Sequence, residues 1–288
     1  MGEYKHPEAL VTTEWVAQHG GDANVRLVEV DVDTSSYEKG HIASAVAWNW
    51  QSQLQDNVRR DLLGRAQYES LMSQSGIKPE TTVVLYGDNN NWFAAYALWQ
   101  LKYYGHADVR LMNGGRKKWE LEGRPFTTTV PKFATTSYKA GPVDENVRAY
   151  RDQVFKVLDN HSANLVDVRS ADEFTGRVIA PPGMTETAQR GGHIPGAISV
   201  PWAKAANDDG TFKSYDELVK LYEGQGVRPD SESIAYCRIG ERSSHTWFVL
   251  RYLLGYEQVR NYDGSWTEWG NLVDAPIEKG ELAKAGGA

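Results

Sequence analysis

The chain contains an internal repeat of whole-domain length. A segment that starts at Tyr86 returns at Tyr236, 150 residues later, and each copy follows an apolar β-branched run. Identical residues then recur at the same offset: Gly105 and Gly255, Val109 and Val259, Gly114 and Gly264, Trp119 and Trp269. Periods of about 20 to 50 residues indicate solenoids, whereas one repeat of this length indicates two domains of one fold.

The two copies differ in length upstream of this segment. Leu27–Val30 resembles Leu165–Val168 at an offset of 138, but Gly40-His41-Ile42 returns as Gly192-His193-Ile194 at an offset of 152. The second copy therefore has about 14 extra residues, which we expect to form a surface loop from Gly176 to Arg190. We predict an N-terminal domain over 1–124, a linker over 125–147 and a C-terminal domain over 148–288.

Within each copy, short runs of Val, Ile and Leu alternate with longer helical patterns. In the first copy, 82–86 reads as a strand, 92–104 as a helix and 109–112 as the next strand. This alternation predicts an α/β fold in which a mainly parallel sheet is covered by helices on both faces. Several of the ten Trp residues recur in both copies, and we expect tryptophan to pack in the cores.

Composition excludes several classes of function. A net charge of -7 and a pI near 5.6 leave no basic surplus for nucleic-acid binding. One cysteine forms no internal disulfide, and the start lacks the basic and apolar regions of a secretory signal. No apolar run approaches the roughly 20 residues of a membrane span. We expect a cytoplasmic protein that binds neither nucleic acid nor membrane.

The single cysteine, Cys237, lies where a strand passes into a helix. Ile234–Tyr236 reads as a strand end, and Ser243-Ser244 reads as a capped helix start. Backbone N–H groups and the dipole of such a helix end favour anions. Arg238 and Arg242 add two cations, so we expect Cys237 to be an ionised, nucleophilic thiolate.

The first copy lacks these features. Gly87 stands at the position of Cys237, and Asp88–Asn91 replaces the cationic loop. We therefore predict that the N-terminal domain is catalytically silent. His41 and His193 occur in both copies, including the one without a nucleophile, which favours a structural hydrogen bond over a base or metal role.

Cys237–Arg242, which reads Cys-Arg-Ile-Gly-Glu-Arg, resembles the active loop of rhodaneses, the thiosulfate:cyanide sulfurtransferases, and in particular their bacterial two-domain forms. Asp167–Arg169, Gly192–Ala197 and Tyr262–Trp266 resemble the family's flanking signatures in order and spacing. The resemblance implies two tandem rhodanese-like domains and a persulfide mechanism. Thiosulfate would give its outer sulfur to Cys237, and cyanide, a small thiol or a protein thiol such as thioredoxin would accept it, with no metal or organic cofactor.

The resemblance also implies a set of site residues. Cys237 would be catalytic, and the rest of the loop would bind the donor: Arg238, Ile239, Gly240, Glu241 and Arg242. Relatives use arginines near the extra loop to hold the donor, which makes Arg177 and Arg190 further candidates. Glu173 departs from the animal enzymes, which carry a substrate-binding arginine there, so that role does not transfer.

Three alternatives remain open. 3-Mercaptopyruvate sulfurtransferases resemble the chain over both domains but usually have Gly and then Ser or Thr after the cysteine, unlike Arg238. Phosphatases of the Cdc25 type share the fold but use a Cys-x5-Arg loop, one residue longer than the loop from Cys237 to Arg242. A non-catalytic binding module is disfavoured by the intact cationic loop.

Overall fold

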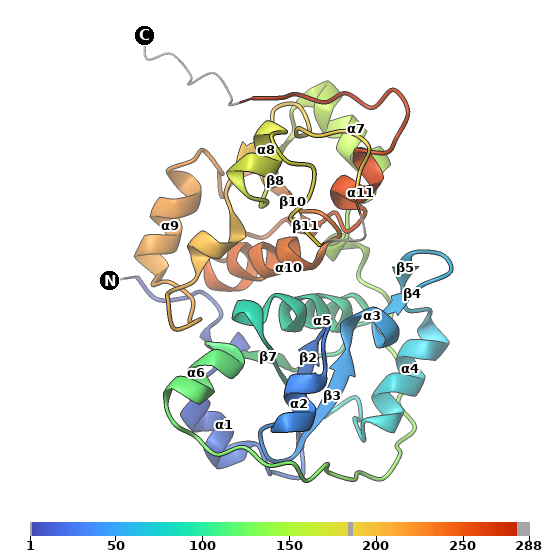
Figure 1. Ribbon diagram of the computed structural model, residues 1–288, viewed down its shortest axis with the longest axis vertical. Coiled ribbons are helices and arrows are strands. Elements are labelled where there is room, and N and C mark those ends of the chain that lie inside the picture. Colours follow the sequence, from blue (N-terminus) through green and yellow to red (C-terminus); the bar gives the residue numbers. More distant parts are fainter. Residues whose placement is uncertain (1, 184–186, 281–288) are drawn as a thin grey trace. The chain divides into compact units, whose positions relative to one another are not determined.

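The computed structural model describes residues 2–183 and 187–280, which form two compact units (Figure 1). The N-terminal unit runs from His6 to Glu145 and also holds Ala206–Lys213. The C-terminal unit holds the described residues of 146–205 and 214–280 together with residues 2–5. Most of the expected linker, up to Glu145, therefore packs with the N-terminal unit.

The N-terminal unit is built on a five-stranded parallel sheet in the order β1-β7-β6-β2-β3, all within the described residues. Every residue of β2 and β6 is buried, as expected for strands of a sheet that is covered on both faces, although β2 includes Arg26, Glu29 and Asp31 among its apolar residues. The strands are β1 (Leu10–Val11), β2 (Val25–Asp31), β3 (Ala45–Asn49), β6 (Thr82–Tyr86) and β7 (Val109–Met112). The helices are α1 (Thr13–His19), α2 (Ser35–Lys39), α3 (Trp50–Gln53), α4 (Arg65–Gln74), α5 (Trp92–Tyr103) and α6 (Gly115–Leu121). A short antiparallel pair joins β4 (Gln55–Asp56) to β5 (Asp61–Leu62).

The C-terminal unit repeats this plan with a four-stranded parallel sheet, in the described residues, of order β11-β10-β8-β9. Its strands are β8 (Ala163–Asp167), β9 (Ile198–Ser199), β10 (Glu232–Tyr236) and β11 (Val259–Asn261). Its helices are α7 (Arg151–Asn160), α8 (Ala171–Thr175), α9 (Tyr215–Glu223), α10 (Glu241–Phe248), which continues as a π-helical turn over Val249–Leu253, and α11 (Ser265–Trp269). Both sheets confirm the predicted α/β class.

Equivalent contacts occur at matching positions of the two units. The Tyr86 hydroxyl accepts a hydrogen bond from the Ile42 N–H, and the Tyr236 hydroxyl accepts one from the Ile194 N–H. His41 Nδ1 contacts a backbone carbonyl at 2.9 Å and His193 Nδ1 contacts another at 2.8 Å. The structural role predicted for both histidines is confirmed.

The tryptophans lie mainly in the two cores, as expected. Seven have at most 4% of their surface exposed: Trp48, Trp50, Trp99, Trp119, Trp247, Trp266 and Trp269.

Two further expectations concern the extra loop and the absence of a membrane span. The extra loop of the second copy begins at Gly176, directly after α8, and its residues 184–186 lie outside the described part of the chain. Within 2–183 and 187–280, no helix has both the length and the apolar character needed to cross a bilayer.

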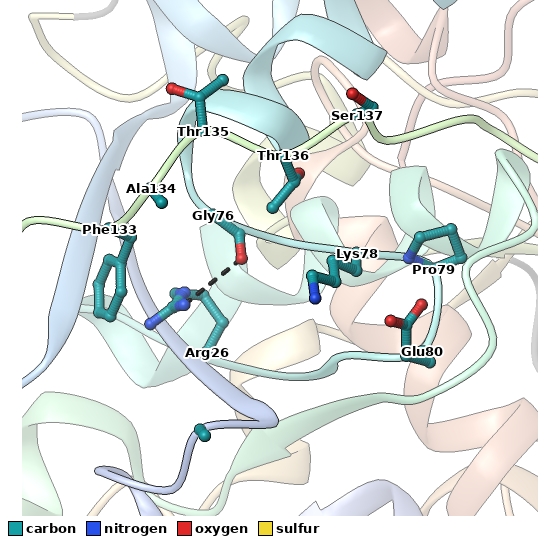
Figure 2. A pocket seen from close by; sticks show the side chains of 11 residues that line it. Arg26, Gly76, Lys78, Pro79, Glu80, Phe133, Ala134, Thr135, Thr136 and Ser137 are labelled. Atoms are coloured by element: carbon teal, nitrogen blue, oxygen red, sulfur yellow. Dashed lines mark hydrogen bonds between the residues drawn. The ribbon is translucent and has the colours of Figure 1, made fainter.

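A surface cavity of about 470 Å³ lies at the amino end of β2 in the N-terminal unit (Figure 2). The Arg26 guanidinium lies over the Phe133 ring, 3.1 Å from its centroid, and contacts the Gly76 carbonyl at 3.4 Å. Lys78 and Glu80 line the same cavity. In open α/β sheets, ligand sites lie beyond the carboxyl ends of the strands, so this cavity lies at the end opposite to the expected site.

Candidate functional site

The candidate site follows the carboxyl end of β10. Cys237 is fully buried directly after this strand, and α10 begins at Glu241, two residues earlier than Ser243. Gly240 makes the earlier start possible because it takes the N-cap position with φ at 101°, in the left-handed region that favours glycine. The serines predicted to cap the helix lie inside its first turn, where the Ser244 hydroxyl donates to the Gly240 carbonyl at 2.7 Å.

The sulfur of Cys237 contacts both a donor and an acceptor. The Gly240 N–H donates to Sγ at 3.1 Å, and Sγ donates to Oε2 of Glu241 at 3.3 Å. The Cys237 N–H donates to the Ser265 hydroxyl at 3.0 Å, and the Cys237 carbonyl accepts from the Trp266 N–H at 3.1 Å. These contacts hold the loop against the first residues of α11 (Ser265–Trp269).

The expected ionisation of Cys237 is wrong for this state of the protein. Burial, and then the negative charge of Glu241, raise the pKa of the thiol above its usual value. Arg242 and hydrogen bonds from Ser243 act in the opposite direction without outweighing them. The sequence shows the cations of the loop but not the burial of its thiol, which is why the expected direction was wrong.

Arg242 is held by a carboxylate from another helix. Its Nη1 and Nη2 donate to the two oxygens of Glu173, in α8, at 3.0 and 3.1 Å. Burial alone would lower the pKa of Arg242, but Cys237, Glu173 and Glu241 together raise it. Burial would raise the pKa of Glu173, but Arg242 outweighs it and lowers that pKa. The sequence shows Glu173 only as a departure from the arginine of the animal enzymes, and it does not indicate the ion pair between Glu173 and Arg242.

The remaining loop residues lie close to Cys237 in the chain and are also largely buried. Arg238 has 7% of its surface exposed and Ile239 has 4%. A Cβ atom added to Gly240 would lie 2.9 Å from Cα of Asp263, so only glycine fits this close approach. Asp263 itself is held by a two-pronged ion pair with Arg148 at 2.9 Å.

The two arginines predicted near the extra loop have other contacts. The guanidinium of Arg190 donates to four backbone carbonyls at the end of α11 and just beyond, those of Trp269, Gly270, Leu272 and Ala275. Arg190 therefore caps α11, and its binding of the donor stays a prediction. Arg177 is largely exposed and pairs with Asp172 at 2.9 Å, as an ordinary surface ion pair does.

A fully buried arginine supports the strand next to the loop. Arg169 contacts Asp167 at 2.6 Å and the Gly192 carbonyl at 2.6 Å, and it stacks 4.3 Å from the Trp266 ring centroid. In the N-terminal unit, Arg116 contacts the equivalent Glu29 and the Gly40 carbonyl at the same distances. The two units thus place a guanidinium against equivalent groups but supply it from different positions in the chain.

The equivalent loop of the N-terminal unit is closed. A Cβ atom at Gly87 would lie 2.3 Å from the Val30 carbonyl oxygen and 3.0 Å from Oδ1 of Asp31. The Gly87 N–H donates to Oδ1 of Asn91 at 3.0 Å. Burial, and then the charges of Asp88 and Glu29, raise the pKa of Asp31 to about 8. This loop therefore has acidic neighbours in place of the cations of its counterpart.

Sequence reasoning also missed His245, in the second turn of α10. It is fully buried, and its ring lies edge-on to Trp202 with the centroids 5.2 Å apart. Burial lowers its pKa to about 3, so the imidazole is neutral at ordinary pH. Its only signal in the sequence was its position three residues after Arg242. Nowhere in the described ranges do three His, Cys, Asp or Glu side chains lie together as a metal site would require.

Comparisons with known proteins agree over nearly the whole chain. A family model described as "Rhodanese-like domain" matches residues 12–122 and 151–272. The chain is 56% identical to a Haloferax volcanii protein named "Putative thiosulfate sulfurtransferase", over 95% of this chain and 97% of that protein. It is also 56% identical to the "Sulfur carrier protein TtuD" of Thermus thermophilus, over 96% and 99% of the two chains. Among solved structures, a persulfide form of EanB with ergothioneine matches at 25% identity with a TM-score of 0.86, covering 98% of this chain and 73% of that one.

Proposed function

Because this chain belongs to the rhodanese-like family and is a sulfurtransferase, we propose that it moves the sulfane sulfur of thiosulfate to a thiophilic acceptor through a persulfide on Cys237. The observation that carries the proposal is the position of Sγ: it lies at the start of α10 and accepts a hydrogen bond from the Gly240 N–H. A helix start stabilises anionic sulfur, whether thiolate or persulfide. The matched EanB persulfide structure supports the same intermediate by similarity.

The reaction consists of two displacements. Sγ attacks the outer sulfur of thiosulfate, the S–S bond of the donor breaks, and sulfite leaves with the electron pair. The acceptor, either cyanide or a thiol such as that of thioredoxin, then attacks the outer sulfur of the persulfide and Cys237 leaves. A covalent intermediate between two half-reactions gives ping-pong kinetics.

Donor binding in this proposal relies on the loop rather than on distant arginines. The N–H groups at the start of α10 and the guanidinium of Arg238 are the positive groups assigned to the donor. Glu173 already binds Arg242 with both oxygens, so Arg242 acts by positioning the loop and by lowering the pKa of Cys237. Thiosulfate, a compact dianion, suits these groups better than 3-mercaptopyruvate, a keto acid with one negative charge.

The proposal predicts that the protein gains one sulfur atom in mass after thiosulfate and loses it again after cyanide. Intact-protein mass spectrometry measures both steps. Cys237→Ser changes little volume in the buried loop and should abolish the gain in mass while leaving the circular dichroism spectrum unchanged. The proposal fails if the wild-type protein, with its thiol titrated as free, shows no gain.

The choice of donor is tested by measuring the steady-state kinetics of both donors in one assay. We expect kcat/KM for thiosulfate to exceed that for 3-mercaptopyruvate, because this ratio reports differential stabilisation of the two transition states. A preference for mercaptopyruvate would keep the persulfide but replace the donor.

A further inference from the structure

The carboxylate of Glu241 faces the nucleophilic sulfur from inside the same loop. Glu241 has 2% of its surface exposed, and its Oε2 accepts the hydrogen bond from Sγ at 3.3 Å. Its other oxygen, Oε1, lies 3.7 Å from Nε of Arg242. A buried carboxylate that contacts a thiol is an acceptor for the thiol proton, and a nucleophile next to a general base is the usual arrangement in covalent catalysis.

The charges of Cys237 and Glu241 favour transfer of the thiol proton to Glu241 over its release to solvent. If Cys237 lost its proton to water, a thiolate and a carboxylate would lie 3.3 Å apart, both buried. Two like charges at this distance in a poorly solvated site are strongly unfavourable. Transfer of the same proton to Glu241 leaves one negative charge on the pair before and after the step.

On the basis of the proposed sulfurtransferase reaction, we propose that Glu241 is a catalytic residue that accepts the Cys237 proton during persulfide formation and returns it after sulfur transfer. In the first half-reaction the S–H electron pair forms the new S–S bond, the proton goes to Oε2, and sulfite leaves as a dianion. In the second half-reaction the acceptor takes the outer sulfur, and the Cys237 thiolate that leaves recovers the proton from Glu241. Each turnover therefore restores the starting protonation without an added acid or base.

The N-terminal unit provides an internal comparison. At the positions equivalent to Cys237 and Glu241 it has Gly87 and Asn91, so the nucleophile and the carboxylate are absent together. The Asn91 side chain instead accepts a hydrogen bond from the Gly87 N–H and donates one to the Met112 carbonyl. The carboxylate is thus present in the copy that has a thiol, and a neutral amide stands in the copy that has none.

Other charged groups around the loop have partners of their own. Glu173, from α8, is held by Arg242, and Asp263, from the turn after β11, is held by Arg148. Asp167, at the end of β8, is held by Arg169. Of these carboxylates in the described part of the chain, Glu241 is the one that accepts a hydrogen bond from Sγ, so we assign the proton-transfer role to it.

Glu241→Gln separates this role from a purely electrostatic one, because the two predict opposite signs. If Glu241 is the base, the first-order rate of persulfide formation at saturating thiosulfate falls by about 100-fold near neutral pH. The rate should also become dependent on the thiolate fraction, rising about tenfold per pH unit below the thiol pKa. If Glu241 only repels negative charge, its removal eases thiol ionisation and the rate rises. Rapid-quench mass measurements from about pH 6 to about pH 9 provide the rate.

Two controls keep the test decisive. Circular dichroism confirms that Glu241→Gln still folds, and the ultraviolet absorbance of the thiolate, titrated with pH, reports its thiol pKa. Glu241→Asp keeps the carboxylate at a longer distance and should recover part of the rate. An unchanged or faster rate in Glu241→Gln, with the wild-type protein still forming the persulfide, would overturn the base role and leave the proposed function intact. No persulfide in the wild-type protein would overturn the proposed function itself.

Discussion

Among single residues, His245 makes stability depend on pH. It is fully buried in α10, and burial lowers its pKa to about 3 from an ordinary value of 6.5. Between these two values the unfolded chain binds a proton that the folded protein does not bind. Stability therefore falls as the pH falls through this window, with a slope of about 1.4 kcal/mol per pH unit.

We predict that His245→Gln flattens the pH dependence of the free energy of unfolding between about pH 6.5 and about pH 5. Glu173 does not interfere in this window. Its pKa is lowered in the folded state, so its contribution is complete above its unfolded pKa of about 4.3 and is lost only at lower pH. Urea unfolding followed by tryptophan fluorescence measures the slope. His161→Asn, at an exposed helix end, is the matched control and should retain the wild-type slope. If His245→Gln kept the wild-type slope, the pH dependence in this window would not come from His245.

At the scale of elements, the strand–loop–helix unit from β10 to α10 depends on the backbone as much as on its side chains. The Gly240 carbonyl accepts hydrogen bonds from the Asn261 amide at 3.0 Å and from the Ser244 hydroxyl at 2.7 Å. The Gly240 N–H contacts the sulfur of Cys237. A shift of this one residue therefore changes the helix start and the nucleophile together.

We predict that Gly240→Ala strongly reduces sulfur loading because its Cβ would press against the backbone of Asp263 and displace the loop. Gly226→Ala is the matched control: Gly226 also has a positive φ, 90°, but a Cβ there meets no atom within 4 Å. It should lose about 1 kcal/mol of stability and keep wild-type loading. Intact mass after thiosulfate and urea unfolding provide the two measurements. Equal loading in both variants would mean that close packing at Gly240 does not position Sγ.

At the scale of the whole molecule, both units keep the same fold, and only the C-terminal unit carries a cysteine in the loop after its sheet strand. Both units retain the parallel sheet, the tyrosine hydroxyl that accepts from the Gly-His-Ile segment, and a guanidinium against the end of the central strand. In the N-terminal unit, however, the space of a nucleophile is filled by the Val30 carbonyl and Asp31. This packing supports the prediction that the N-terminal unit is catalytically silent.

We predict that Gly87→Cys, introduced together with Cys237→Ser, does not restore sulfur loading. The Cβ of the new side chain would lie 2.3 Å from the Val30 carbonyl oxygen, so the loop would have to shift to hold it, and burial there raises the pKa of a thiol. Mass spectrometry after thiosulfate tests this, and titration of the thiol under denaturing conditions confirms that it is present and reduced. A gain of one sulfur in this double variant would show that a cysteine alone is sufficient at this position.

The sequence alone was sufficient for the fold class and the two-domain organisation, and it was sufficient to propose Cys237 as the nucleophile, because hydrophobic periodicity, repeated glycines and a loop motif are local patterns. Tertiary structure decided the charge state around that cysteine. Glu173 lies 69 residues from Arg242 in the chain and neutralises it, and burial raises the pKa of the thiol. Arg190 likewise caps α11 through contacts about 80 residues away in sequence. Electrostatic roles depend on burial and on distant partners, and these are set only when the chain has folded.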